Sequence, residues 1–188
     1  MRYRLAEIFF SIQGEGYWSG RPAVFVRFSG CNRDCSFCDT DHKPKFILTA
    51  LEVFEACEQF FPCRFVVFTG GEPLLQLDSN LLFLFRNWST AIETNGTLPN
   101  PYPISHVTVS PKVSPEELKE NFQSVSEIRY AVGEDFVLPD ISSLPFADNY
   151  FLSPIDLTER NIAKCLELCK ANPKWRLSIQ IHKLINIP

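Results

Sequence analysis

Residues 23–38 read AVFVRFSGCNRDCSFC, a stretch that joins a strand pattern directly to a group of cysteines. Its first part, Ala23–Ser29, is rich in Val and Phe and ends at Gly30, as buried strands do. Three cysteines, at positions 31, 35 and 38, follow at once. In parallel α/β sheets, ligands bind at the carboxyl ends of the strands. The stretch therefore predicts a parallel sheet with a ligand site at one edge.

The rest of the chain continues this alternation of strands and helices. Strand patterns cover Arg64–Thr69, Ala91–Thr94, His106–Val109, Ser124–Val132, Tyr150–Leu152 and Arg176–His182. Helix patterns cover 49–61, which opens with the capping box Thr49-Ala-Leu-Glu52, and also 76–88, 158–171 and a segment that begins at Ser114-Pro-Glu-Glu117. Strands that alternate with helices predict a mainly parallel sheet. Because the chain is short for eight such units, we expect an abbreviated, incomplete (β/α) barrel that forms one domain over residues 1–188.

Composition limits the possible partners and compartment. The chain has 18 Lys and Arg against 22 Asp and Glu and shows no basic stripe, so we expect no nucleic-acid partner. No apolar run is long enough to cross a membrane, and Glu7 and Gln13 interrupt any secretory signal pattern, so we expect a cytoplasmic protein. Seven cysteines in a reducing compartment indicate metal or redox chemistry rather than disulfides.

The cysteine triplet is the strongest chemical signal. An ordinary [4Fe–4S] electron carrier has four cysteine ligands, so three leave one iron open to a small chelating cofactor. The alternative is a zinc site completed by His42 or Asp39. The remaining cysteines, at positions 57, 63, 165 and 169, are expected to be small buried hydrophobes, although an auxiliary cluster is a second interpretation. His106 is expected to be structural.

Further polar residues follow later strands. Thr69-Gly-Gly-Glu-Pro73 closes a predicted strand with two glycines, which let backbone approach a ligand, and Glu72 offers a carboxylate to a cationic group. Three more polar segments, Glu93–Gly96, Ser110–Lys112 and Ser153–Asp156, follow other strands, although each such segment alone is more often a loop or helix cap.

The N-terminal segment SIQGEG, residues 11–16, adds an amide at Gln13 and a carboxylate at Glu15. A solvated turn is the ordinary interpretation of this segment. Arg27, however, lies within an apolar strand, where an unpaired guanidinium is costly. Arg27 therefore needs an anionic partner, for which a substrate carboxylate is one candidate.

The spacing CxxxCxxC, with Phe37 beside the last cysteine, resembles the signature of the radical S-adenosylmethionine enzymes, and TGGEP strengthens that resemblance. Within this superfamily the chain resembles the 7-carboxy-7-deazaguanine synthases. The matching segments are SIQGEG (11–16), Arg27, CNRDCSFCDT (31–40), TGGEP (69–73), ETNGT (93–97), SPK (110–112) and QIHK (180–183). The resemblance implies conversion of 6-carboxy-5,6,7,8-tetrahydropterin to 7-carboxy-7-deazaguanine with loss of ammonia. It also implies that S-adenosylmethionine is regenerated.

The resemblance also assigns roles to residues. Cys31, Cys35 and Cys38 would hold the [4Fe–4S] cluster, and Thr40 would bind Mg²⁺. The cofactor S-adenosylmethionine would contact Phe37, Gly71, Glu72, Ser110, Pro111, Lys112, Ser153, Pro154, Ile155 and Asp156. The pterin would contact Ile12, Gln13, Gly14, Glu15, Arg27, Thr69, His182 and Pro188. Some relatives read Gln-Pro where this chain has Ser153-Pro154, which leaves that contact open.

The family further implies a homodimer and an electron donor such as flavodoxin or ferredoxin. Two functions of other classes remain as alternatives. One is an activase that installs a glycyl radical on a partner protein, and the other is a non-enzymatic iron–sulfur or zinc module.

Overall fold

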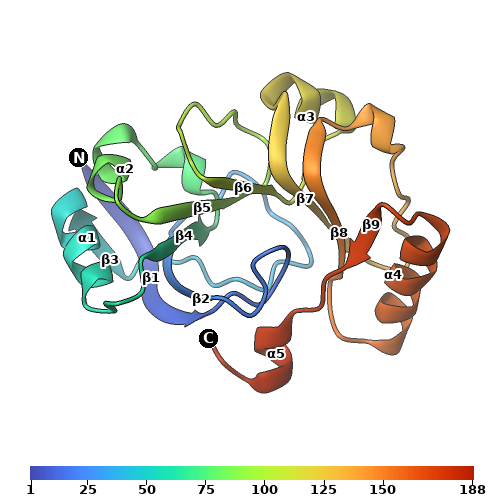
Figure 1. Cartoon of the computed structure of the whole chain (residues 1–188), viewed down its shortest axis with the longest axis horizontal. Coiled ribbons are helices and arrows are strands. Elements are labelled where there is room, and N and C mark those ends of the chain that lie inside the picture. Colours follow the sequence, from blue (N-terminus) through green and yellow to red (C-terminus); the bar gives the residue numbers. More distant parts are fainter.

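The computed structural model describes residues 1–188 and contains one nine-stranded sheet in the order β3-β1-β2-β4-β5-β6-β7-β8-β9 (Figure 1). The strands are β1 (Arg2–Ile12), β2 (Pro22–Phe28), β3 (Phe46–Thr49), β4 (Phe65–Gly70), β5 (Ser89–Thr94), β6 (His106–Val109), β7 (Ser124–Val132), β8 (Phe146–Pro154) and β9 (Trp175–Leu177). From β2 to β9 all pairs are parallel, whereas β1 runs antiparallel to β2 and β3. Since β3 and β9 remain as edges, the prediction of an incomplete, mainly parallel barrel is confirmed.

Four helices lie on the outside of the curved sheet, and a fifth lies near the C-terminus (Figure 1). They are α1 (Ala50–Glu58), α2 (Ser79–Leu84), α3 (Pro115–Asn121), α4 (Glu159–Ala171) and α5 (Ile181–Ile185). The predicted capping box forms, because the Thr49 hydroxyl accepts from the Glu52 N–H while the Glu52 carboxylate accepts from the Thr49 N–H. At the start of α3 the Ser114 side chain accepts from the Glu117 N–H, and at the start of α4 the Thr158 side chain accepts from the Asn161 N–H.

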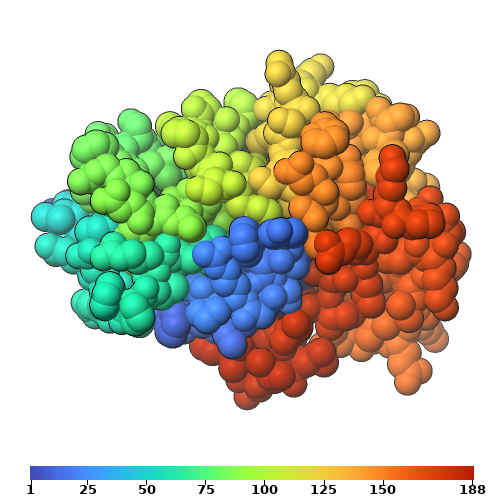
Figure 2. Space-filling view, in the orientation of Figure 1, coloured from blue at the N-terminus to red at the C-terminus, as the bar shows by residue number.

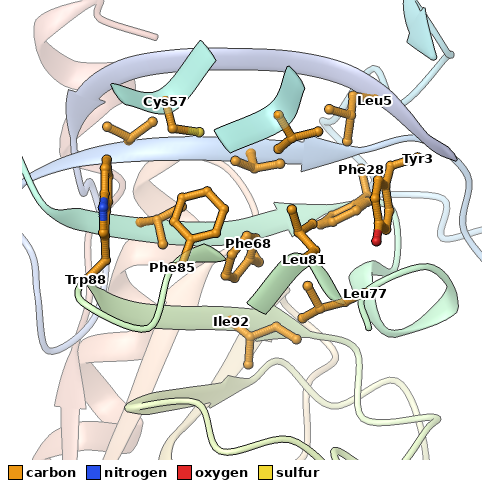
Figure 3. Close-up of a cluster of buried hydrophobic side chains, with 14 residues drawn as sticks. Tyr3, Leu5, Phe28, Cys57, Phe68, Leu77, Leu81, Phe85, Trp88 and Ile92 are labelled. Carbon is orange, nitrogen blue, oxygen red and sulfur yellow. The ribbon is translucent and has the colours of Figure 1, made fainter. Parts of the chain in front are cut away.

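The core is divided between the two ends of the sheet. The larger cluster packs β1, β2, β4 and β5 against α1 and α2, with Phe28, Phe68 and Phe85 at its centre (Figure 3). The rings of Phe68 and Phe85 meet edge to face with centroids 5.4 Å apart. The second cluster packs β6, β7 and β8 against α3 and α4. The outer face of the sheet therefore carries most of the packing. A third, smaller cluster lies on the inner face and consists of Ala23, Phe25, Phe65, Val67 and Ala91.

Two predicted elements differ from the structure, and two strands of the structure were not predicted. The predicted helix over 76–88 is only the six residues of α2, because Asp78 caps its start and its C-terminal end comes at Phe85. The predicted strand Arg176–His182 is wrong beyond Leu177, since the chain leaves the sheet and the Ile181 N–H donates to the Gly14 carbonyl. Strands β1 and β3 were not predicted. In β1, the alternating pattern is interrupted by a register shift between Leu5 and Glu7.

The segment at the end of β1 and just after it lies beside the C-terminal segment on one face of the molecule (Figure 2). The Ser11 hydroxyl donates to the Pro188 carbonyl at 2.8 Å, and the Gly16 N–H donates to the Ser178 hydroxyl at 2.9 Å. The C-terminal segment is thereby held against SIQGEG. None of the helices has both the length and the apolar character that crossing a bilayer requires.

Candidate active site

Two cavities lie side by side where the parallel strands end. The first, called here the cysteine cavity, is lined by Cys31, Cys35, Phe37, Cys38, Gly71, Asn95, Ser110, Lys112, Arg129, Ser153, Pro154 and Ile155, among others. The second, called the polar cavity, is lined by Glu7, Ile12, Gln13, Gly14, Arg27, His182, Lys183 and Pro188, among others. Six side chains line both: Glu15, Asp39, Thr40, Thr69, Glu93 and Gln180. The two cavities therefore share a wall.

The cysteine loop starts from Gly30 at the end of β2 and packs against the glycine turn after β4. Gly30 has φ +85°, in the left-handed region that favours glycine. Its carbonyl accepts from the Glu72 N–H at 2.9 Å, and its N–H donates to the His42 carbonyl at 3.1 Å. A Cβ atom on Gly71 would overlap the Gly30 carbonyl. The second glycine of TGGEP is thus required for the close approach of these two backbones.

The three cysteines suit an iron–sulfur cluster. All are free thiols at the cavity, and Cys38 is exposed. Cys31 Sγ accepts from the Arg33 N–H at 3.4 Å and from Asn95 Nδ2 at 3.8 Å, and such bonds to sulfur tune cluster potentials. Nowhere in residues 1–188 do three or more His, Cys, Asp or Glu side chains gather as ligands of one metal ion.

That arrangement favours the cluster over the zinc alternative. Zinc requires four ligands around a single ion, whereas cysteines of a cubane each bind a different iron atom. The Asp39 carboxylate, one of the two candidate fourth ligands, is paired with Lys183 instead. His42 lines the cavity without joining the cysteines around one point.

Glu72 differs from its expected role. Its side chain is 0% exposed and does not line the cavity. The carboxylate accepts from the Leu74 N–H, the Thr94 hydroxyl and the Asn95 N–H at 3.0, 2.9 and 2.8 Å. Burial raises its pKa above the ordinary value despite these bonds. Glu72 therefore fixes Asn95 beside Cys31, and the expected direct contact of its carboxylate with a cofactor ammonium is not what the structure shows.

Most of the other expected cofactor residues converge on the cysteine cavity, as Phe37, Gly71, Ser110, Lys112, Ser153, Pro154 and Ile155 all line it. Lys112 Nζ donates to the Ser110 hydroxyl at 3.0 Å and lies 5.4 Å from the centre of the Phe37 ring. Burial lowers the pKa of Lys112 below its ordinary value. Pro111 and Asp156 do not line the cavity. The Asp156 carboxylate instead accepts from the Thr158 N–H and from Asn161, so it organises the start of α4.

All eight residues expected to contact the pterin line the polar cavity. Arg27 stands beside Glu7 in the β1–β2 register, and Arg27 Nε donates to Glu7 at 3.2 Å. The predicted anionic partner of Arg27 is thus present in the protein, while the two terminal nitrogens of the guanidinium bond no protein acceptor. His182 packs directly over Gly14, where a Cβ atom would overlap the imidazole. Strand register and the C-terminal segment together build this cavity.

Thr40 lies at the shared wall of the two cavities. Its hydroxyl donates to the neighbouring Asp39 carboxylate at 3.4 Å, and that carboxylate pairs with Lys183 on α5. Burial would raise the pKa of Asp39, but the Lys183 ammonium and its hydrogen bond hold that pKa below the ordinary value. A hydroxyl and a carboxylate are oxygen donors of the kind that Mg²⁺ prefers, so these residues fit that ion.

The sequence interpretation missed Arg129, a buried residue of β7 at the floor of the cysteine cavity. Arg129 Nη2 lies 2.8 Å from Glu93 and 3.8 Å from Glu15, and Nη1 lies 3.1 Å from Glu127. Burial alone would lower the pKa of Arg129, but the three carboxylates outweigh it and raise that pKa. Burial would likewise raise the pKa of Glu93, and Arg129 holds it below the ordinary value. In the sequence, the feature that could have indicated this site is the charged pair Glu127 and Arg129 inside the strand pattern SVSEIRYAV, residues 124–132.

The other cysteines behave as small hydrophobes. Cys57 belongs to the core cluster over α1 and α2, and Cys165 belongs to the one under α4. Burial raises the pKa of each thiol to about 12, so both stay protonated. Cys63 packs against the first of these clusters and Cys169 against the second, so the four thiols are divided between two parts of the core. No three of them gather as ligands, and the structure gives no support to an auxiliary cluster. His106 is buried against Tyr17 and Trp18, as a structural histidine would be.

Comparisons with known proteins agree with this geometry. Residues 25–132 match the family model described as the radical SAM superfamily, and the chain is a member of that class. It is 41% identical over 190 residues to the 7-carboxy-7-deazaguanine synthase of Bacteroides thetaiotaomicron and 38% identical over 213 residues to that of Bordetella pertussis, and each comparison covers 100% of both chains. The crystal structure of QueE from Escherichia coli is similar with TM-score 0.76 and 29% identity, over 97% of this chain and 95% of that one. The chain belongs to the 7-carboxy-7-deazaguanine synthase family.

Proposed function

We propose that the chain is a 7-carboxy-7-deazaguanine synthase that converts 6-carboxy-5,6,7,8-tetrahydropterin to 7-carboxy-7-deazaguanine with release of ammonia. One observation carries the proposal. A cavity lined by three free cysteines shares a wall with a cavity lined by every residue expected to bind the pterin. Full-length relatives with this name support the same assignment.

Cys31, Cys35 and Cys38 would hold the [4Fe–4S] cluster, and Ser110, Lys112, Ser153 and the Gly70–Gly71 backbone would surround S-adenosylmethionine. When bound, the cluster and S-adenosylmethionine would supply one-electron reductive cleavage of a sulfonium and hence a carbon radical able to abstract hydrogen. The protein's own task is to hold two ligands in contact and exclude water. The shared wall of Glu15, Thr69 and Glu93 suits that task, because each of these side chains faces both cavities.

The polar cavity offers groups that match a carboxylated pterin. The free terminal nitrogens of Arg27 can form a fork with the substrate carboxylate. Gln13, Glu15 and Glu93 supply amide and carboxylate groups for the edge of the pterin ring, which carries both donors and acceptors. Mg²⁺ bound by Thr40 would neutralise the substrate carboxylate and fix its orientation.

The remaining parts of the proposal concern the whole chain. One continuous sheet supports a single domain over residues 1–188. Seven free cysteines support a reducing compartment, the cytoplasm. Family membership supports a homodimer and a small electron donor such as flavodoxin or ferredoxin, and sedimentation and reduction assays test these two points.

The proposed function is tested by anaerobic reconstitution with iron and sulfide, followed by incubation with reductant, S-adenosylmethionine, Mg²⁺ and the carboxylated tetrahydropterin. The expected product is 7-carboxy-7-deazaguanine with one ammonia released per turnover. Cleavage of S-adenosylmethionine without this product would favour a glycyl-radical activase. A chain that carries zinc, or a cluster whose spectrum ignores S-adenosylmethionine, would favour a non-enzymatic module.

A further inference from the structure

Arg129 is the centre of a charge cluster whose two buried members, Arg129 and Glu127, have no role in the preceding assignments. Its side chain contacts Glu15 in the segment after β1, Glu93 on β5 and Glu127 on the same strand, β7. Arg129 and Glu127 are 6% and 1% exposed. Three carboxylates against one guanidinium leave the cluster, named here the Arg129 cluster, with a net negative charge. Such a group is costly to bury unless hydrogen bonds of good geometry compensate for the lost hydration.

The geometry of the contacts depends on arginine in particular. One terminal nitrogen of the guanidinium donates to Glu93 at 2.8 Å, and the other donates to Glu127 at 3.1 Å. The planar fork can thus hold two carboxylates in fixed directions at the same time. A lysine ammonium at this place keeps the charge but not the fork, so it would hold one carboxylate well at the expense of the other.

The carboxylates in turn hold side chains of both cavities. Glu93 accepts from Gln13 Nε2 at 3.1 Å and from the Thr69 hydroxyl at 2.9 Å. Glu15 accepts from the Ser153 hydroxyl at 2.6 Å. Because Gln13 and Thr69 line the polar cavity and Ser153 lines the cysteine cavity, the orientation of groups in both cavities depends on where Arg129 fixes these carboxylates.

A fourth contact extends the same control to the backbone. The Glu127 carboxylate, held by Arg129, accepts from the Tyr17 N–H at 2.8 Å. A Cβ atom on Gly16 would overlap that carboxylate, so the chain there passes close over Glu127. The turn that follows Glu15 is therefore seated on the Arg129 cluster.

We propose that Arg129 is a positioning residue of the reaction, which acts through Glu93 and Glu15 to aim Gln13 and Thr69 at the pterin. The inference rests on the proposed function. Arg129, which is distant in sequence from the motifs that it contacts, would thus keep the hydrogen bonds of the polar cavity in one arrangement.

The protonation state of Glu93 provides a readout that a purely structural role would not change. As a carboxylate, Glu93 accepts from both Gln13 and Thr69, and a proton on it would remove part of that capacity. Arg129 keeps the pKa of Glu93 low, so weakening their contact raises this pKa. The acid limb of the pH–activity profile then moves to higher pH. The other charged or titratable groups around this wall and the Arg129 cluster are Glu15, Arg27, Asp39, Lys112, Glu127 and His106, whose Nε2 lies 3.5 Å from Glu127.

The test compares Arg129→Lys with the matched control Arg176→Lys. Arg176 lies on β9, is exposed, stacks on Phe151 and lines neither cavity. In reconstituted enzyme we expect Arg129→Lys to raise the KM for the pterin about tenfold or more, in line with the loss of a charge-assisted hydrogen bond. We also expect it to move the acid limb upward and leave iron per chain unchanged. Arg176→Lys should match the wild type in all three.

A second variant guards against misfolding. Arg129→Met combined with Glu127→Gln removes both members of the deepest pair, while the glutamine oxygen still accepts from the Tyr17 N–H. It should show the same upward shift of the acid limb and a larger rise in KM.

Unchanged KM and pH profile in either folded variant, with only a lower melting temperature, would overturn the role of Arg129 while leaving the synthase assignment intact. A wild-type chain that forms no deazaguanine would overturn both.

Discussion

The cysteine loop, residues 30–45, and the Arg129 cluster border the same cavity but are built in opposite ways. The loop contains no regular element, and its thiols are half-buried or exposed. In the Arg129 cluster, Arg129, Glu127 and Glu93 lie on strands, Arg129 and Glu127 are buried, and Glu15 and Glu93 are half-buried. Each of its carboxylates accepts a hydrogen bond from a neighbouring segment. The difference indicates that the loop's chemistry can be deleted with little effect on folding, whereas the Arg129 cluster serves the fold and the site together.

The largest expected effect comes from the loop. Cys35→Ala should abolish iron binding beyond background and all cleavage of S-adenosylmethionine, because two cysteines cannot hold a cubane. The melting temperature should stay near that of the wild-type apoprotein, since the Cys35 side chain belongs to no core cluster. Iron analysis and thermal melts measure both. Cys63→Ala, which changes a thiol outside both cavities, is the matched control and should retain iron. A Cys35→Ala chain that fails to fold would contradict the contrast.

The second-largest effect is expected from a substitution at the backbone contact between the cysteine loop and the glycine turn after β4. Gly71→Ala would press a methyl group into the Gly30 carbonyl, so the turn or the cysteine loop must shift. We expect a loss of about 1–3 kcal/mol in the free energy of unfolding, typical of overpacking. We also expect much weaker binding of S-adenosylmethionine in calorimetric titration.

Gly133→Ala serves as the control for that substitution, because its Cβ atom would meet only the end of the Ile155 side chain at 3.2 Å. Equal effects of the two substitutions would argue against a special approach at Gly71.

A smaller effect is expected at the shared wall. Thr40→Val keeps the side-chain shape and removes the hydroxyl, so the stimulation of product formation by Mg²⁺ should fall about tenfold while iron content is retained. Activity measured over a series of Mg²⁺ concentrations, with iron analysis of the same samples, checks this. Parallel loss of iron and of the Mg²⁺ response would count against the proposed ligand.

The smallest effect is expected at Cys165, which packs under α4 and away from both cavities. Cys165→Ala should leave iron and activity unchanged and lower the free energy of unfolding by about 1 kcal/mol, as for a modest core truncation. Denaturant titration of the apoprotein measures the change. Any loss of iron would revive the idea of an auxiliary cluster.

The parts of the site predictable from sequence are those carried by local patterns. Three such patterns, each contained within a few consecutive residues, are SIQGEG, the triplet Cys31, Cys35 and Cys38, and TGGEP. Strand–helix alternation likewise gives the sheet and its open barrel, because each element's own pattern suffices.

What could not be predicted depends on contacts between distant segments. The Glu72 carboxylate accepts hydrogen bonds from Thr94, the last residue of the next strand, and from Asn95 just after it, which the tetrapeptide alone does not reveal. The cost of burying an unpaired guanidinium applies to Arg129 as much as to Arg27, but its partners lie 36 and 114 positions away on other segments. The segment after Leu177 has the pattern of a strand, yet it leaves the sheet, and the Ile181 N–H donates to the Gly14 carbonyl instead of to a neighbouring strand.

The shared wall has a consequence for how ligands bind. Both cavities are lined by Glu15, Thr69 and Glu93, so a ligand that moves these side chains in one cavity also changes the lining of the other cavity. Occupancy of the two sites is then thermodynamically linked, and linkage is reciprocal. If S-adenosylmethionine tightens the dissociation constant of the pterin by some factor, the pterin must tighten that of S-adenosylmethionine by the same factor.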